Sequence, residues 1–118
     1  MKTQIELLHK YEIENYIIGD GLIIIDDTLD LNTLVSCDKT FLQNTTINGN
    51  LNLNSLTTCD SNFLCNVSIN GNLNLNSLIN YDEIFLKNTI INGSLNLQSL
   101  SYFDKNTLRD NIISIKTI

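Results

Sequence analysis

Apolar residues return every 22 residues along this chain, each time with similar polar neighbours. Blocks 29–50, 51–72, 73–94 and 95–118 align without a gap. The apolar columns are Leu29, Leu51, Leu73, Leu95; Leu31, Leu53, Leu75, Leu97; Leu34, Leu56, Leu78, Leu100; Phe41, Phe63, Phe85; Leu42, Leu64, Leu86, Leu108; and Ile47, Ile69, Ile91, Ile113. One such repeat cannot bury its apolar side alone, so neighbouring repeats must stack. The sequence therefore predicts a solenoid whose like residues form continuous columns.

Each repeat also indicates how its coil is built. In the segment INGNLNLNSL, leucine alternates with asparagine, which is the period-two pattern of a strand with one face buried. Gly49, Gly71 and Gly93 are expected to supply unusual backbone angles for the bend before this strand. The pattern predicts a mainly β fold: a right-handed parallel β-solenoid, leucine-rich-repeat-like, of four to five 22-residue coils.

Four aspartates, one in each block, precede the phenylalanine columns or their equivalent. They are Asp38, Asp60, Asp82 and Asp104. We expect each of them to cap a short helical turn, because aspartate accepts hydrogen bonds from the first amides of a helix. Stacked carboxylates also suit calcium or a raised pKa. Capping is favoured, since the glycine-rich loop of calcium-binding solenoids is absent from the sequence.

Residues 1–28 are interpreted as a helical cap followed by half a coil, and residues 29–118 as the repeats, within one structural domain. One face of a short helix is predicted from Ile5, Leu7, Leu8 and Tyr11. From Leu22 the spacing of the later coils begins, with Asp27 at the position of the repeated glycine. A cap is needed because an open solenoid end exposes apolar side chains and unpaired strand groups.

Composition narrows the functional classes. Hydrophobic residues make up 42 % of 118 residues and charged residues 17 %, as expected for one folded domain. No apolar run is long enough for a membrane helix and the first residues are too charged for a secretory signal, so we expect a cytoplasmic protein. The net charge of −6 argues against direct nucleic-acid binding.

The charge is unevenly distributed along the chain. Residues 1–30 hold seven acids against two lysines, whereas the remaining 88 residues, 31–118 of the 118, hold six acids against five bases. The sequence therefore predicts an acidic end and a nearly neutral body.

No residues suggest a cofactor, a metal or catalysis. Cys37, Cys59 and Cys65 form no metal-binding pair, and His9 is expected to be an ordinary surface histidine. Cys37 and Cys59 share a column with Tyr81 and Phe103, so this column is expected to point inward. No acid, base and nucleophile set converges in the sequence, and we therefore predict that the protein is not an enzyme.

The pattern resembles the short leucine-rich-repeat-like solenoid proteins of tailed phages and prophages. The resemblance rests on the segment Tyr11-x-Ile13-x-Asn15-Tyr16-x-Ile18, on Asp20-Gly21-x-Ile23-x-Ile25 and on the repeated core (V/T)-x-I-N-G-N-L-N-L-N-S-L. Those relatives usually carry a proline near the phenylalanine position, and this chain has none. The resemblance implies a phage or mobile-element setting and a binding scaffold.

Three surfaces are candidates for contact with another protein. The acidic cap comprises Glu12, Glu14, Asp20, Asp26, Asp27 and Asp30. The polar sheet face comprises Asn52, Asn74 and Asn96, which either bond to one another as a ladder or form a flat platform for a partner. Ile90 and Ile112, beside inward Ile91 and Ile113, are expected to form an exposed strip that serves self-association together with Ile115.

The leading hypothesis is a non-catalytic inhibitor or adaptor that binds a host protein. A defence nuclease of the CRISPR type is one example, because acidic side chains can occupy a groove meant for nucleic acid. The alternative is a structural or assembly protein that forms a homodimer or longer rod through its solenoid ends. Neither hypothesis involves a membrane.

Overall fold

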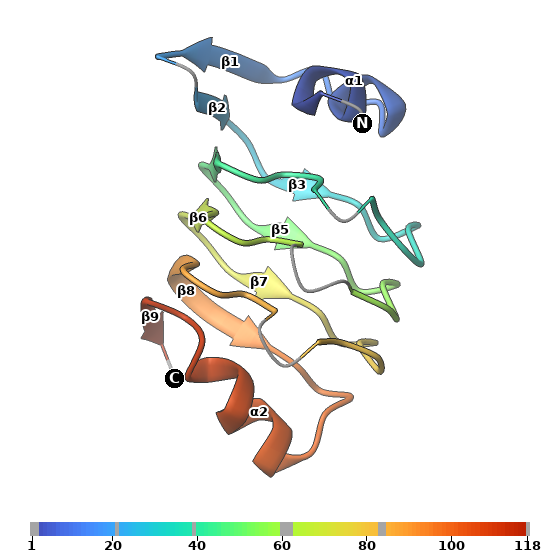
Figure 1. Cartoon of the computed structure of the whole chain (residues 1–118), viewed down its shortest axis with the longest axis vertical. Helices are drawn as coiled ribbons and strands as arrows, with labels where there is room; N and C mark the ends of the chain where they lie inside the picture. Colours follow the sequence, from blue (N-terminus) through green and yellow to red (C-terminus); the bar gives the residue numbers. More distant parts are fainter. Residues whose placement is uncertain (1–2, 21, 39, 60–62, 83–84, 118) are drawn as a thin grey trace.

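The computed structural model describes residues 3–20, 22–38, 40–59, 63–82 and 85–117. Figure 1 shows stacked coils between two helices, and the molecule measures 37 × 26 × 21 Å. The helices are α1 (Gln4–Lys10) and α2 (Tyr102–Arg109). The strands are β1 (Tyr16–Gly19), β2 (Leu22–Ile25), β3 (Leu29–Asp30), β4 (Thr45–Ile47), β5 (Leu51–Asn52), β6 (Ser68–Ile69), β7 (Leu73–Asn74), β8 (Ile90–Asn96) and β9 (Ser114–Thr117). The predicted mainly β solenoid with a helical cap is confirmed.

Equivalent strands of successive coils pair in parallel. On one side the order is β2, β4, β6, β8 and β9, and β1 extends this row as an antiparallel edge. On the other side, β3, β5, β7 and β8 pair, so that Leu51 lies opposite Leu73 and Leu73 opposite Leu95. Like residues therefore lie directly over one another, as the 22-residue spacing predicts.

The stacked columns form a single core. The inward-facing leucines and isoleucines of the strands are buried, and the phenylalanine column lies among them. The rings of Phe63 and Phe85 stack with centroids 6.1 Å apart and planes 6° from parallel. Because the next coil supplies the contacts that complete each core layer, no coil is stable alone.

The repeated glycines act through their size, which corrects the expectation about unusual backbone angles. Gly49, Gly71 and Gly93 keep φ outside the left-handed region, but a Cβ on Gly71 would lie 2.5 Å from the carbonyl oxygen of Gly49. A Cβ on Gly93 would meet the carbonyl oxygen of Gly71 just as closely. Glycine is therefore required because successive backbones approach too closely for any side chain.

The left-handed angles lie elsewhere in the coil, in the turn that follows each phenylalanine. Leu42, Leu64 and Leu86 have φ values of 68°, 61° and 71°. The asparagines two positions later are left-handed as well, which asparagine tolerates but leucine does not. The leucines are completely buried. Their burial offsets a backbone strain of about 1 kcal/mol each.

Of the four repeated aspartates, the structure describes Asp38, Asp82 and Asp104, whereas Asp60 lies outside the described residues. The backbone carbonyls of Asp38 and Asp82 each accept the N–H of the phenylalanine three positions later, at 3.0 Å. The predicted cap at Asp104 is wrong, because Ser101 caps α2 and accepts the N–H of Asp104 at 3.2 Å.

The final coil departs from the 22-residue spacing. Helix α2 replaces the short turn, and Ile115, not Ile113, pairs with Ile91. The shift arises because an eight-residue helix consumes more chain than the turn it replaces. Phe103, expected to point inward with Cys59, is instead 75 % exposed on α2. Ile113, also expected inside, is 63 % exposed.

Helix α1 covers the opposite end of the stack. Leu7 and Leu8 are buried, whereas Ile5, which was expected on the same face, is exposed. Thr3 caps the helix by accepting the N–H of Glu6 at 3.1 Å. The Gln4 amide bonds to the carbonyl of Thr40 and accepts the N–H of Leu42 at 3.0 Å, which ties α1 to the first coil's strained turn.

Candidate functional site

Asparagine side chains form ladders along the solenoid. On the polar sheet face, the Asn74 amide donates to the Asn52 oxygen at 2.6 Å, and the Asn96 amide donates to Asn74. The predicted self-satisfied ladder is therefore confirmed. Asn72 and Asn76 lie in two further columns, whose side-chain oxygens accept backbone N–H groups of the next coil. These amides hold the coils in register, and each retains donor or acceptor capacity for a partner.

A further ladder, which the sequence analysis did not single out, ends on one of the acidic residues. Asn92 donates to Asn70 and Asn70 to Asn48, both at 2.7 Å, and Asn48 donates to the Asp26 carboxylate at 3.2 Å. Each amide donates toward the first coil, and the negatively charged Asp26 carboxylate accepts the last hydrogen bond of the ladder. Asp26 therefore stabilises the first coil, which is a structural role inside the group interpreted as a binding surface.

Six residues of the acidic cap are all exposed, but the structure gathers only four of them. Glu12, Glu14, Asp27 and Asp30 line one depression of about 160 Å³ between α1 and the first coil. Asp20 lies at the end of the β1–β2 hairpin, and Asp26 ends the asparagine ladder. We call the hollow that Glu12, Glu14, Asp27 and Asp30 line, together with seven uncharged residues, the acidic depression.

Glu12 occupies a strained position beside this depression. It follows α1 in a left-handed conformation, with φ of 60°. Its N–H donates to the His9 carbonyl at 3.1 Å and the N–H of Ile13 donates to the Leu8 carbonyl at 2.8 Å. This is the helix-ending motif in which glycine is usual. A glutamate at a glycine position costs about 1 kcal/mol.

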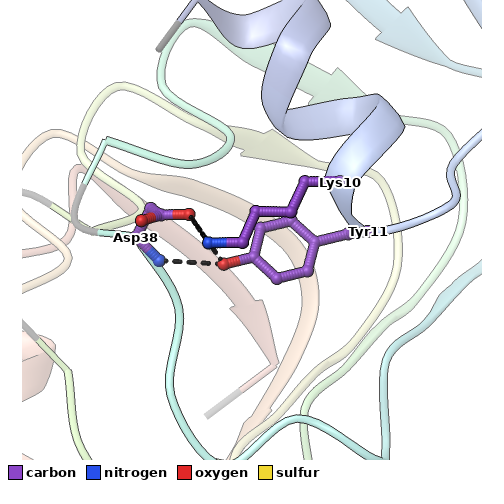
Figure 2. A network of polar contacts seen from close by, with 3 residues as sticks. All are labelled: Lys10, Tyr11 and Asp38. Carbon is purple, nitrogen blue, oxygen red and sulfur yellow. Dashed lines mark hydrogen bonds and ion pairs between the residues drawn. The ribbon is translucent and has the colours of Figure 1, made fainter. Parts of the chain in front are cut away.

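A polar network joins α1 to the first coil behind the depression (Figure 2). The Lys10 ammonium lies 2.7 Å from the Asp38 carboxylate, and the Tyr11 hydroxyl donates to the same carboxylate at 2.9 Å. The Tyr11 ring packs on Phe41, with centroids 4.3 Å apart. Hydrogen bonding to Asp38 raises the pKa of Lys10, and burial raises the pKa of Tyr11. Because these residues are 27 and 28 positions from Asp38, the sequence contained no signal for this network.

Lys10 is the one lysine or arginine among the described residues between 3 and 38. Its ammonium contacts Asp38 and lies 5.3 Å from the centre of the Tyr11 ring. The exposed pair adds little stability. The Lys10 ammonium is directed toward Asp38, and Lys10 also lines a neighbouring depression with Glu12 and Asp30.

The cysteines are free thiols. Cys59 is buried and Cys37 is half-buried, packed against the core as expected. Burial, helped by the charge of Asp38, raises the pKa of Cys37 to about 12, and burial also raises the pKa of Cys65. Both thiols are therefore protonated at neutral pH, which makes them poor nucleophiles.

The isoleucines assigned to self-association do not form the expected exposed strip. Ile90 is half-buried in β8 between Ser68 and Ser114. Ile112 and Ile115 pack against the core, because the longer final coil moves them inward. The strongly exposed apolar residues near this end are instead Tyr102 and Phe103 of α2, and Ile113.

Within the described part of the chain, no three histidine, cysteine, aspartate or glutamate side chains are placed to hold a metal ion. No helix of the described residues has the length and apolar character needed to cross a bilayer. Comparison with protein-family models, curated proteins and solved structures yields no match to this chain. The resemblance to phage solenoids therefore stays a prediction.

Proposed function

We propose that this chain is a non-catalytic scaffold that binds a basic surface of a partner protein through its acidic depression. The observation that carries the proposal is the convergence of Glu12, Glu14, Asp27 and Asp30, with Glu12 held in a conformation that favours glycine. Four acidic residues lining one hollow would attract a Lys- or Arg-rich surface and raise the rate of encounter. A host nuclease, whose nucleic-acid groove is basic, fits this description, with the cytoplasm as the place of encounter.

The rigidity of the solenoid supports this function. Ladders of hydrogen bonds fix the coils, and the contacts of Gln4, Lys10 and Tyr11 fix α1 on the first coil. Acidic side chains anchored to such a scaffold lose little conformational freedom on binding. The half-buried, protonated thiols and the self-bonded amides provide no catalytic machinery, so binding is the function that we propose.

A charge-matched pair of variants tests the acidic depression. The first variant carries Glu12→Gln, Glu14→Gln, Asp27→Asn and Asp30→Asn. The control carries Ser36→Lys, Thr58→Lys, Asn80→Lys and Asn106→Lys, at exposed positions outside the depression. Each variant changes the net charge by the same amount. Immobilised protein is exposed to lysate of a bacterial host, and the captured proteins are quantified by mass spectrometry at low and moderate salt.

We expect the wild type and the control to capture the same basic proteins, and the depression variant to capture them at least tenfold less. This corresponds to about 1.4 kcal/mol or more of lost electrostatic attraction. Capture should also decrease with salt. Equal capture by both variants would rule out the depression as the binding site, and a decrease shared by both would show that net charge alone is responsible.

A second candidate function, self-assembly, is favoured by the exposed aromatic residues of α2. Tyr102 is 80 % and Phe103 75 % exposed, and aromatic residues are enriched in protein–protein interfaces. Light scattering after size exclusion tests it. If this face associates, the mass rises with protein concentration, and Tyr102→Ser with Phe103→Ser returns the protein to a monomer. The control, Val35→Ser with Ile79→Ser, removes two other exposed apolar side chains. A monomer at all concentrations excludes this function.

A further inference from the structure

Strand β1 has no partner on its outer side among the described strands. It pairs with β2 in the antiparallel sense and ends the row of strands, whereas α1 lies to one side, over the other half of the first coil (Figure 1). Edge strands can recruit other strands, and many proteins oppose this with proline, lysine or a bulge in the edge strand. The segment from Tyr16 to Gly19 has the sequence YIIG and contains none of these devices.

The register indicates which backbone groups face outward. Gly19 pairs with Leu22, and the pair next to a two-residue connection is normally the hydrogen-bonded kind. Because hydrogen-bonded and non-bonded pairs alternate, Ile17 and Ile24 also bond to each other. The N–H and C=O groups of Ile18 then point away from β2, toward the open side. They are the groups that an added strand would bond.

An apolar hollow lies beside this edge and offers a place for a side chain of the added strand. It has a volume of about 250 Å³, enough for one large apolar side chain. The hollow is lined by Thr3, Gln4, Ile5, Ile18, Ile23, Gln43 and Asn44. Ile18 is 52 % exposed and its paired residue Ile23 is buried, so Ile18 lies at the rim, between the open edge and the core. A residue placed opposite Ile18 would therefore bury apolar surface on both partners.

Charge defines the flanks of the segment that fits here. Glu14 precedes β1 and Asp20 follows it, and both are exposed. Lys10, the one lysine or arginine among the described residues of 3–38, bonds to Asp38 on the first coil, and His9 lies at the start of the edge, with its Nε2 3.5 Å from the Tyr16 hydroxyl. Lysine or arginine on either side of a short apolar run would therefore be complementary to both ends of the edge.

We propose that β1 binds an extended segment of a partner protein, with apolar residues at its centre and Lys or Arg at its ends, as an additional strand. This inference rests on the proposed function and specifies its mode: backbone bonds to Ile18 give affinity, the apolar hollow selects one side chain, and Glu14 and Asp20 select the flanking charges. Ile17, which is 57 % exposed, packs against the other face of the added strand.

The test uses a labelled heptapeptide with two lysines at each end and valine, phenylalanine and valine between them. Its binding to the full chain is followed by fluorescence anisotropy. Two analogues carry N-methyl groups on alternate residues, one in each frame, which removes backbone donors from one side of the peptide and leaves the charge unchanged. Because an added strand bonds through one side only, one analogue should bind at least tenfold more weakly and the other should match the parent.

Two variants of the protein test the same backbone hydrogen bonds by changing Ile18 instead of the peptide. Ile18→Pro removes the outward N–H and leaves the bonds to β2, which an edge strand tolerates, and it should weaken binding at least tenfold. Ile18→Val keeps the N–H and should bind like the wild type. If the proline variant is unfolded by circular dichroism, the methylated analogues on the wild type still decide.

The possible results separate strand addition from attraction by charge alone. Equal binding of both analogues and the parent means that only charge attracts the peptide, which overturns strand addition and leaves the acidic-depression proposal intact. Absence of binding by the folded wild type up to millimolar peptide also overturns strand addition. The proposed function fails separately, when the charge-matched depression variant and its control capture the same proteins from lysate.

Discussion

Replacing Gly71 by alanine is expected to destabilise the protein by about 3 kcal/mol, because backbone atoms occupy the space of the new methyl group. The added Cβ would lie 2.5 Å from the carbonyl oxygen of Gly49, 2.7 Å from its carbonyl carbon, and 2.5 Å from the side-chain oxygen of Asn50. Neither backbone atom can rotate away. The neighbouring coils must separate, which stretches the parallel hydrogen bonds on both sides of the glycine.

Thermal unfolding followed by circular dichroism measures this effect, and a decrease in Tm of roughly 10–15 °C is expected for a domain of this size. Gly19→Ala is the matched control, since no atom lies within 4 Å of its added Cβ. The control should unfold at or slightly above the wild-type temperature, because alanine lowers the conformational entropy of the unfolded chain relative to glycine. Equal effects of the two substitutions would contradict the close stacking of the glycine column.

Phe63→Ala is the second large effect, with an expected loss of about 4 kcal/mol in the free energy of unfolding. The ring is 1 % exposed, and it stacks on Phe85 near the middle of the solenoid. Its removal leaves a cavity that the rigid coils cannot fill. Since each coil is stabilised by its neighbours, the cavity weakens the contacts of the whole central region.

Urea unfolding measures this change, and Phe103→Ala provides the control. Phe103 is the same residue type but 75 % exposed, so its substitution should alter stability by less than about 0.5 kcal/mol. A loss below about 1 kcal/mol for Phe63→Ala would mean that the phenylalanine column does not form part of the core.

The architecture could be predicted from the sequence because every coil repeats the same pattern of apolar and polar residues. Leu51, Leu73 and Leu95 occur at equal spacing between asparagines, and the structure pairs them in register. The same spacing misassigned Ile113, because the eight-residue helix α2 changes the length of the final coil. A regular repeat predicts contacts only where the backbone path is also repeated, and α2 lies where it is not.

Local backbone conformation was less accessible to sequence reasoning. Glycine is associated with left-handed angles, so Gly71 was expected to adopt one, yet Leu64 and Asn66 of the same coil do. A buried leucine in this conformation opposes the usual preference of the residue. It is stabilised by tertiary packing, which no local pattern reveals.

The acidic cap was predicted in part. The surplus of acids in residues 1–30 is evident from the sequence, and Glu12, Glu14, Asp27 and Asp30 do lie around one depression. Asp20 lies apart from this group because it belongs to the turn of the β1–β2 hairpin. Asp26 lies apart because it accepts a hydrogen bond from Asn48 at the end of a ladder. Whether Asp26 points toward Asn48, 22 positions away in the sequence, depends on how the folded coils stack.

The asparagine ladders make the middle of this molecule modular. Asn92, Asn70 and Asn48 each donate in the same direction to a residue 22 positions earlier. An inserted or deleted unit of 22 residues therefore meets an identical bonding pattern above and below. In-frame tandem duplication can lengthen the rod, and recombination can shorten it, while both ends remain unchanged. We therefore expect any homologue of different length to differ by whole 22-residue units and to keep the acidic depression.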